Sequence, residues 1–269
     1  MATRTHTRAE LVLLGTGIQL GRHITARIPS ELQRADTVFT LTDGWALQWL
    51  KDLRPDAISL HEHYGDDKDR RETYREMHDR ILAELQRDRI VAAVFYGHPA
   101  VYADVPHTAL RAAREQGIPA RMEPGISAEA CLYADLGLDP GKRGTQSFEA
   151  TQFLISQREA DPTSTLILWQ IALCGDLGCT RFQATPAYLE ILVDKLRRWY
   201  PAETPCILYE APQFALGHTR MDSVPLQELA QAHYREHTTL VIPPSRELDW
   251  DQEILSKLAK AGADTNQLP

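Results

Sequence analysis

The chain has 269 residues, which suits one large domain or two modest ones, and its 43% apolar and 25% charged residues are ordinary for a soluble globular protein. Its formal net charge is −8 and it has no basic block, so binding along a nucleic-acid backbone is not expected, although a local pocket for an anion stays open. No apolar run approaches the roughly 20 residues of a membrane span, and the N-terminus lacks the apolar core of a signal peptide. The four cysteines form no CxxC pair, so we expect reduced thiols in a cytoplasmic protein without a metal site.

The first half of the chain alternates strand and helix signals. We expect strands at 11–14, 37–41, 57–60, 90–95 and 120–122, and helices at 29–35, 45–53, 74–85 and 105–116. Such βα repeats predict a mostly parallel sheet. The turn Gly15-Thr-Gly17 begins like a dinucleotide-binding fingerprint, but position 20 is Leu where the third glycine would stand, so it is a weak signal by itself.

The second half is richer in long, β-branched strands and predicts an α+β domain. Strands are expected at 165–171, 206–210 and 238–242, helices at 127–136 and 187–199, and a loop at 140–144. Pro243-Pro244 stops the last strand. We therefore divide the chain into an α/β domain at 1–122, an α+β domain at 123–245 and a short helical tail at 246–269. In the tail Trp250, Ile254 and Leu258 share one helical face, which predicts a helix docked on its own domain.

Two strand ends stand out. The apolar run 90–95 stops at Tyr96-Gly-His-Pro99, and Pro124-Gly125 precedes Ser127, which is placed to cap the next helix. Either turn alone is as well explained as an ordinary connection. Because ligands of open α/β sheets collect at the carboxyl ends of strands, the two turns together, in this order and spacing, predict the floor of a ligand site.

An arginine extends an apolar helix stripe. Tyr74, Met77, Ile81 and Leu85 share one face of the helix over 74–85, and Arg70 lies four residues before Tyr74. A guanidinium that is even partly buried there needs an anion or a hydrogen-bond acceptor. The plainer interpretation is that Arg70 lies at a frayed helix start and points into water. The spacing leaves both interpretations open.

With these residues in place, the chain resembles the tetrapyrrole-methylase superfamily of S-adenosylmethionine-dependent methyltransferases over about residues 11–244. The resemblance rests on Leu14-Gly-Thr-Gly17, Gly97-His-Pro-Ala-Val-Tyr102 and Pro124-Gly-Ile-Ser-Ala128. Within it the chain is more similar to the borosin peptide α-N-methyltransferases, in His61-Glu-His-Tyr64, Arg70-Arg-Glu-Thr-Tyr74, Phe95-Tyr-Gly-His-Pro99, Ala120–Glu129, Cys131–Leu136, Leu138-Asp-Pro140, Phe148-Glu-Ala150 and Ile242-Pro-Pro244. The resemblance implies a two-domain class III methyltransferase fold with the cofactor cleft between the domains.

The resemblance also implies site residues. The family arginine and two tyrosines around the peptide amide match Arg70, Tyr64 and Tyr74, whereas a further family tyrosine is replaced by His61, whose role stays open. Contacts to S-adenosylmethionine, which would leave as S-adenosylhomocysteine, carry over to ten positions. These are Tyr96, His98, Val101, Tyr102, Ser127, Ala128, Gln170, Tyr209, Thr238 and Thr239. A turn histidine satisfied by backbone is the other interpretation of His98, and no metal is implied.

Methylation of an amide nitrogen requires a base. An amide nitrogen is a poor nucleophile, so its proton must be removed or the imidate-like oxygen stabilised. A tyrosine, with an unperturbed pKa of about 10, becomes a base near neutral pH only beside a cation and away from water. Our hypothesis is that Tyr74, or Tyr64 beside it, accepts the proton while Arg70 polarises the amide oxygen.

Many borosin enzymes carry their substrate as a C-terminal extension. Here about 25 residues follow Pro244 and hold no apolar, β-branched core peptide, so we expect the split form, which acts on a separate precursor peptide. The resemblance further implies a homodimer, joined by two precursor chains into a heterotetramer, in which the helix at Trp250 could take part. The alternatives are a small-molecule methyltransferase of the same superfamily and a non-catalytic module that holds cofactor and peptide.

Overall fold

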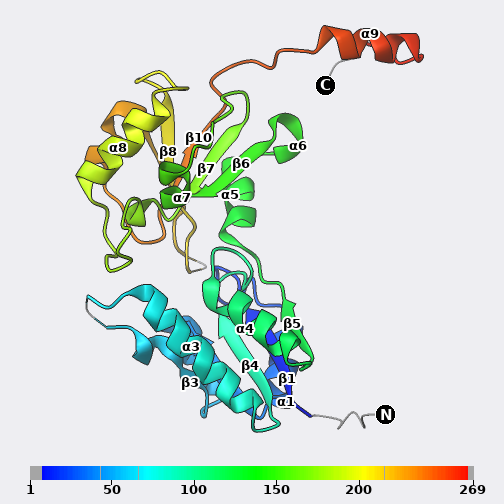
Figure 1. The fold of residues 1–269 in the computed structure, drawn as a ribbon, viewed down its shortest axis with the longest axis vertical. Helices are drawn as coiled ribbons and strands as arrows, with labels where there is room; N and C mark the ends of the chain where they lie inside the picture. The colour runs from blue at the N-terminus through cyan, green and yellow to red at the C-terminus, as the bar shows by residue number, and fades with distance from the viewer. Residues whose placement is uncertain (1–7, 43, 66, 215, 266–269) are drawn as a thin grey trace. The chain divides into compact units, whose positions relative to one another are not determined.

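The computed structural model describes residues 8–42, 44–65, 67–214 and 216–265 (Figure 1). Contacts between residues divide the chain into two compact units. The first takes in the chain up to Leu136, with Asp176–Arg181 and Glu210–Arg220, and the second takes in Gly137–Gly175, Phe182–Tyr209 and the chain from Met221. Residues 123–136 thus join the first unit, because Glu123 is the last residue of a strand that pairs with Leu14. We keep the limits 1–122, 123–245 and 246–269 as a proposal about which parts of the chain fold independently.

The first unit is built on a five-stranded sheet in the order β3-β2-β4-β1-β5. Its strands are β1 (Glu10–Gly15), β2 (Thr37–Leu41), β3 (Ile58–Ser59), β4 (Ile90–Phe95) and β5 (Ala120–Glu123). Every pairing is parallel, with Leu11 opposite Val91 in β4 and opposite Ala120 in β5. The expected parallel sheet is confirmed, and all five strands end at one edge.

Helices cover both faces of this sheet. Along β1, Leu11 and Leu13 join the apolar cluster under α3 (Arg70–Leu85) and α4 (Asp104–Glu115), which pack side by side (Figure 1). Val12 and Leu14 face the opposite cluster under α1 (Arg27–Arg34) and α2 (Gly44–Leu53). Since successive side chains of a strand point to opposite faces, strands buried on both sides are apolar throughout, which explains the uninterrupted run 90–95.

The third strand is shorter than the expected 57–60. It ends at Ser59, whose Oγ accepts the backbone N–H of His61 at 3.3 Å, and a 3₁₀ helix over Leu60–His63 follows. A serine hydroxyl that captures a backbone N–H two residues on favours a turn over further strand. The expected strand was therefore wrong at its end, and the turn carries His61 and Tyr64 out at the carboxyl edge.

The second unit has a five-stranded sheet of mixed direction, in the order β6-β7-β10-β8-β9. Its strands are β6 (Thr145–Glu149), β7 (Thr165–Trp169), β8 (Pro205–Glu210), β9 (Arg220–Pro225) and β10 (Thr239–Ile242). β6 pairs with β7 in parallel, whereas β10 is antiparallel to β7 and to β8. β6 and β9 were not foreseen, because polar residues interrupt the apolar pattern of both strands.

The helices of the second unit cover an apolar core on one face of that sheet. They are α7 (Ala150–Ile155) and α8 (Pro186–Leu196), with 3₁₀ segments at Ile171–Leu173 and Leu226–Gln231, whereas α6 (Pro140–Arg143) has no buried residue. The expected loop at 140–144 is a single helical turn, begun by Asp139, whose side chain accepts the N–H of Gly141. Lys195 is buried and donates to the carbonyls of Phe153, Leu154 and Ser156, which closes the end of α7.

The tail forms α9 (Gln252–Lys260), begun by Asp251, whose side chain accepts the N–H of Ile254. The helix has no buried residue, and Trp250, Ile254 and Leu258 stay about half exposed. The expected helix is present, but its expected docking on its own domain is not observed. Within the described ranges, no helix combines the length and apolar character that crossing a bilayer requires.

Candidate functional site

Three glycines bring the carboxyl ends of β1, β4 and β5 together. A Cβ on Gly15 would stand 2.5 Å from the carbonyl oxygen of Gly97, and one on Gly125 would overlap that same oxygen. Gly17 and Gly97 exchange backbone hydrogen bonds of 3.0 and 3.1 Å. Only residues without a side chain allow this approach, so the three glycine-containing motifs of the sequence meet at one place.

A histidine that sequence reasoning missed holds the turn after β1. His23 Nδ1 accepts the backbone N–H groups of Ile18 at 3.3 Å and of Gln19 at 3.1 Å. Burial lowers the pKa of His23, with a smaller contribution from Arg22, so the ring stays a neutral acceptor near pH 7. A histidine six residues after Gly17 gives no signal in the sequence, because only the folded turn brings it back to the backbone.

The turn after β4 is held by its own histidine. His98 Nδ1 accepts the N–H of Ala100 at 3.0 Å, and the His98 carbonyl accepts the N–H of Val101 at 3.1 Å. Burial lowers the pKa of His98, which again favours the neutral ring. The turn-histidine interpretation is therefore confirmed for Nδ1. Tyr102, with a left-handed φ of 51°, and Tyr96 flank the turn and are both well exposed.

The turn after β5 has the expected cap. Ser127 Oγ accepts the N–H of Ala130 at 3.2 Å, and Ala128 is the first residue of α5 (Ala128–Leu136). Tyr96, His98, Val101, Tyr102, Ser127 and Ala128 therefore all follow β4 or β5 at the carboxyl edge of the first sheet. The structure brings these six expected cofactor residues to one edge.

The other four expected cofactor residues gather at one end of the second sheet. Thr239 lies opposite Tyr209 in the β10–β8 pairing, Thr238 precedes Thr239, and Gln170 follows β7 directly. Tyr209 and both threonines are buried. Gln170 has a left-handed φ of 56°, a conformation that costs energy for a residue with a side chain and that is common at functional sites.

Aromatic rings cluster where the chain leaves β3. The rings of Tyr64 and Tyr74 meet edge to face, with centroids 6.5 Å apart and planes at 89°, and the His61 ring lies 5.8 Å from that of Tyr64. Both tyrosines are half-buried against the core under α3. The structure thus brings together His61, Tyr64 and Tyr74 at the same carboxyl edge, with Arg70 one helical turn from Tyr74.

Arg70 is buried and bound, so the interpretation that it points into water was wrong. Its guanidinium donates to the carbonyl of Arg181 and lies 3.4 Å from Asp176 Oδ2, while its backbone N–H donates to the carbonyl of Cys179 at 2.9 Å. Asp176 Oδ2 also accepts the N–H of Arg181 at 2.9 Å. Asp176 could not be foreseen from any local pattern, because it lies 106 residues beyond Arg70.

Side chains also fix the segment between Tyr64 and α3. Lys68 Nζ lies 2.6 Å from Glu76 Oε2 and donates to the carbonyl of His63 at 2.9 Å, and His63 Nδ1 is 3.2 Å from the same carboxylate. Asp69 begins α3 by accepting the N–H of Arg71 at 2.8 Å. These contacts hold Tyr64 and the start of α3 in a defined arrangement, which a site that positions an acceptor requires.

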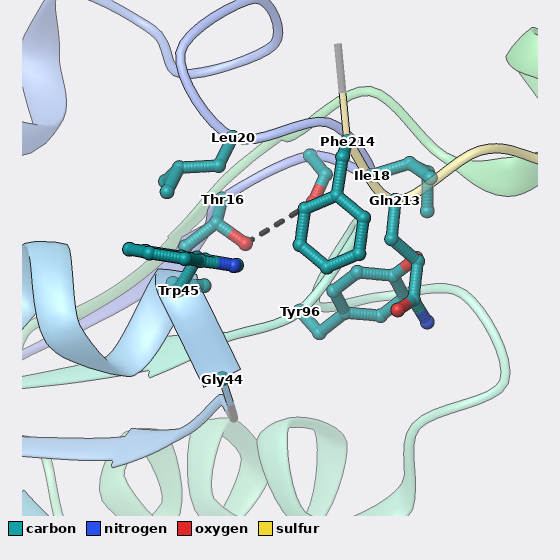
Figure 2. A pocket seen from close by; sticks show the side chains of 10 residues that line it. Thr16, Ile18, Leu20, Gly44, Trp45, Tyr96, Gln213 and Phe214 are labelled. Carbon is teal, nitrogen blue, oxygen red and sulfur yellow. Dashed lines mark hydrogen bonds between the residues drawn. The ribbon is translucent and has the colours of Figure 1, made fainter. Parts of the chain in front are cut away.

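A small pocket opens beside the glycine turns. Its volume is about 160 Å³, and it lies at the tips of β1, β2 and β4 (Figure 2). It is lined by Thr16, Gly17, Ile18, Leu20, Gly44, Trp45, Ala46, Tyr96, Gln213 and Phe214. No lining residue has a charged side chain, and Thr16 Oγ1 is bonded to the carbonyl oxygens of Gly17 and Phe95. The pocket is therefore suited to an apolar group.

With this geometry in view, the family is clear. Residues 10–212 match the model of the Tetrapyrrole (Corrin/Porphyrin) Methylases, and the chain belongs to that family. The match spans the first sheet, the glycine turns and strands β6, β7 and β8 of the second sheet.

Several relatives match nearly the whole chain, and their names combine a methyltransferase with the precursor of a cyclic peptide. A methyltransferase/ribosomally synthesized cyclic peptide gymnopeptides precursor of Gymnopus fusipes is 31% identical over 98% of this chain and 64% of its own length. The corresponding omphalotin A precursor protein of Omphalotus olearius is 32% identical, over 96% and 63%, and a type I borosin cyclic peptide precursor protein of Serendipita vermifera subsp. bescii is 33% identical, over 93% and 63%. The chain spans a little under two thirds of the length of these three relatives.

Solved structures agree on the fold. The uroporphyrin-III-C-methyltransferase of Thermus thermophilus matches with a TM-score of 0.62 and 19% identity, over 91% of this chain and 99% of its own. A diphthine synthase matches with a TM-score of 0.60 and 12% identity, over 89% and 92%. These identities are low, and the likeness establishes the two-sheet, tetrapyrrole-methylase-like α/β fold.

Proposed function

We propose that this protein is an S-adenosylmethionine-dependent methyltransferase that methylates backbone amide nitrogens of a ribosomally made peptide. Family membership supports methyl transfer, and the peptide precursors in the relatives' names support the acceptor. The observation that carries the proposal is the Tyr64–Tyr74 pair, with the buried Arg70 one turn away, at the same sheet edge as the glycine turns. Base and cation are what a poorly nucleophilic amide needs.

The residues present fit the cofactor. Gly15, Gly97 and Gly125 let the backbones of three strand tips pack against one another, which brings the turns after β1, β4 and β5 to one place. Tyr96, Tyr102 and the capped turn at Ser127 surround this place on the first sheet. Bound S-adenosylmethionine would supply a methyl group on a sulfonium. Contacts from Gln170 and its neighbours on the second sheet stay part of the proposal.

The tyrosines would remove the amide proton. In the proposed reaction the phenolate of Tyr74, or that of Tyr64, would take the proton from the amide nitrogen of the acceptor. The cation of Arg70 would stabilise the phenolate before the proton moves and the negative charge that then develops on the amide oxygen. A guanidinium has five N–H donors, so its contacts to Arg181 and Asp176 can fix its plane while it serves the acceptor. His61, in contact with the Tyr64 ring, would help to shape this group.

We further propose that the acceptor is a separate precursor chain, and that a homodimer binds two precursors as a heterotetramer. The test is intact-mass spectrometry of candidate precursor peptides after incubation with the protein and S-adenosylmethionine. Mass gains in methyl steps, placed on backbone nitrogens by fragmentation, support the peptide proposal. Native mass spectrometry of the same mixture checks the four-chain assembly, and a monomer that turns over would overturn that part.

A specific observation also supports one alternative, a small-molecule methyltransferase, because the family name and the name of the solved protein of Thermus thermophilus both refer to tetrapyrroles. Methylation of a porphyrinoid, with no gain on peptides, would favour a small-molecule methyltransferase. Cofactor binding without methylation of either acceptor would leave the non-catalytic binding module.

A further inference from the structure

The uncharged pocket lined by Trp45, Tyr96 and Phe214 shares Tyr96 with the proposed cofactor site, whereas Trp45 and Phe214 have no role in the methyl transfer described above. Figure 2 shows the ring of Trp45 on one side of it and the rings of Phe214 and Tyr96 on the other, with Thr16 between them. Trp45 is 66% exposed and Phe214 50%, a costly arrangement for two large apolar side chains in water. Aromatic walls around an uncharged space favour an apolar guest.

The size of the pocket limits the guest. Its volume of about 160 Å³ is close to that of cavities of roughly 150 Å³ that bind benzene in an engineered protein. It is well below the roughly 300 Å³ at which pockets for drug-sized ligands begin. A whole cofactor or tetrapyrrole therefore exceeds it, whereas one branched or aromatic side chain fits.

The position of the pocket points to the source of that side chain. Trp45 follows β2, Tyr96 follows β4 and Thr16 follows β1, so the pocket shares the carboxyl edge with the tyrosine group after β3. β4 is two strands from β3, which corresponds to about 10 Å, a distance that an extended peptide covers in about three residues. A peptide lying along this edge can place one side chain in the pocket while a nearby amide meets Tyr74.

We propose that this pocket binds one apolar side chain of the acceptor peptide and thereby selects which amide, about three residues away, is methylated. The inference rests on the proposed function and deepens it. Thr16 Oγ1 already donates to backbone carbonyls and no lining side chain is charged, so a charged side chain would lose its hydration there without an ion-pair partner. His23 holds the backbone of Ile18 and Gln19, so the turn that carries the lining residue Ile18 is preformed.

The test uses a peptide that the wild-type protein methylates, with Phe, Val, Ala or Lys placed in turn at each position within about three residues of the methylated amide. At the position that the pocket reads, Phe and Val peptides should have a KM at least about tenfold below that of the Lys peptide. Moving the apolar residue by one position should move the methylated nitrogen by one position, as read by fragmentation.

Two variants change the pocket in opposite ways. Phe214→Ala opens one wall and should raise the KM of the Phe and Val peptides about tenfold, with less than about a twofold effect on the Ala peptide. Ala46→Leu fills the space and should exclude Phe while the Ala peptide is still methylated. Leu216→Ala, a truncation of a residue that is 93% exposed, and Leu53→Ala at the end of α2 are matched controls that should leave KM unchanged.

The outcomes separate the two proposals. Equal effects of Phe214→Ala on all peptides, or methylation that does not follow the apolar residue, would overturn the pocket assignment while peptide methylation stands. A loss of S-adenosylmethionine affinity in either variant, measured by calorimetry, would assign the pocket to the cofactor and overturn the inference. A wild-type protein that methylates no peptide would overturn both proposals.

Discussion

Arg70 Nη2 lies 3.4 Å from Asp176 Oδ2, and both side chains are almost entirely shielded from solvent. The contact joins the start of α3 to a segment 106 residues further along the chain. A buried guanidinium needs such a partner, because desolvation of an unpaired charge costs several kcal/mol. Asp176 therefore decides whether Arg70 keeps the orientation that the proposed reaction uses.

Removal of that carboxylate should affect both stability and turnover. We expect Asp176→Ala to lower the free energy of unfolding by about 3 kcal/mol, because a buried cation loses its partner. We also expect the turnover of methylated peptide to fall about tenfold or more, since Arg70 loses one of the contacts that fix the plane of its guanidinium. Chemical denaturation and mass-spectrometric turnover measure the two effects. Asp176→Asn keeps an acceptor for the Arg181 N–H and should recover most of the stability; if Asp176→Ala kept full turnover, Arg70 would need no such positioning.

Tyr74→Phe removes the hydroxyl that we assign as the proton acceptor. Methyl transfer should fall by a factor of about 10² to 10⁴, the usual contribution of a general base, while S-adenosylmethionine affinity stays unchanged. The ring remains, so the edge-to-face contact with Tyr64 is kept. Single-turnover kinetics and calorimetry measure the two quantities. Retention of wild-type turnover would remove Tyr74 from the base role and leave Tyr64 to be tested in the same way.

Tyr200→Phe is a tyrosine variant with the opposite expected outcome. The Tyr200 side chain is buried, and within the described ranges its hydroxyl has no hydrogen-bond partner; burial raises the pKa of Tyr200 to about 12. Removal of an unsatisfied buried hydroxyl should raise the free energy of unfolding by about 1 kcal/mol. The variant also serves as the control for Tyr74→Phe, because methyl transfer should not change. A destabilised Tyr200→Phe protein would show that the hydroxyl has a partner after all.

Gly125→Ala tests the meeting of the strand tips. Its Cβ would overlap the carbonyl oxygen of Gly97, so the turns after β4 and β5 must move apart. We expect a loss of about 1–3 kcal/mol of stability and at least a tenfold loss of S-adenosylmethionine affinity. Gly178→Ala is the control, because a Cβ there would meet only side-chain atoms at 3.6 Å or more. Unchanged cofactor affinity in Gly125→Ala would place the cofactor away from these turns.

Glu84 predicts an acid-sensitive fold. Burial alone would raise its pKa, but the hydrogen bond from Arg80 and the charges of Arg87 and Arg89 outweigh it, so the pKa of Glu84 is lowered. A carboxyl whose folded pKa is lowered stabilises the fold fully above its unfolded value of about 4.5, and this contribution is lost as the pH falls through the folded pKa.

The matching variant is Glu84→Gln, which removes the charge but keeps the shape. At pH 7 it should unfold about 2 kcal/mol more easily than the wild type, and the difference should shrink as the pH falls below about 4. Guanidinium denaturation at several pH values gives both curves. A difference that is the same at pH 3 and pH 7 would show that the ionised carboxylate adds no stability.

The sequence predicted much of the first sheet because its signals are local. Apolar runs such as 90–95 mark strands buried on both faces, and the stripe from Tyr74 to Leu85 marks α3. The glycine-containing turns and the Ser127 cap were foreseen at their positions, since each is set by a residue type that the backbone needs there. The resemblance to the borosin family then identified Tyr64, Tyr74 and Arg70 as candidate site residues.

The tertiary structure alone decided what lies beyond local pattern. Asp176 reaches Arg70, His23 reaches the turn after β1, and Ser59 ends β3 early, although none of these residues has a periodic signal. The pocket of Trp45, Tyr96 and Phe214 draws on three distant segments in the same way. Periodicity reports which side of an element is buried, whereas the partner of a buried polar group depends on packing between segments that the sequence does not order in space. The sequence by itself therefore determined most of the strands, the glycine turns and the family, and the tertiary structure decided which side chains hold the site together.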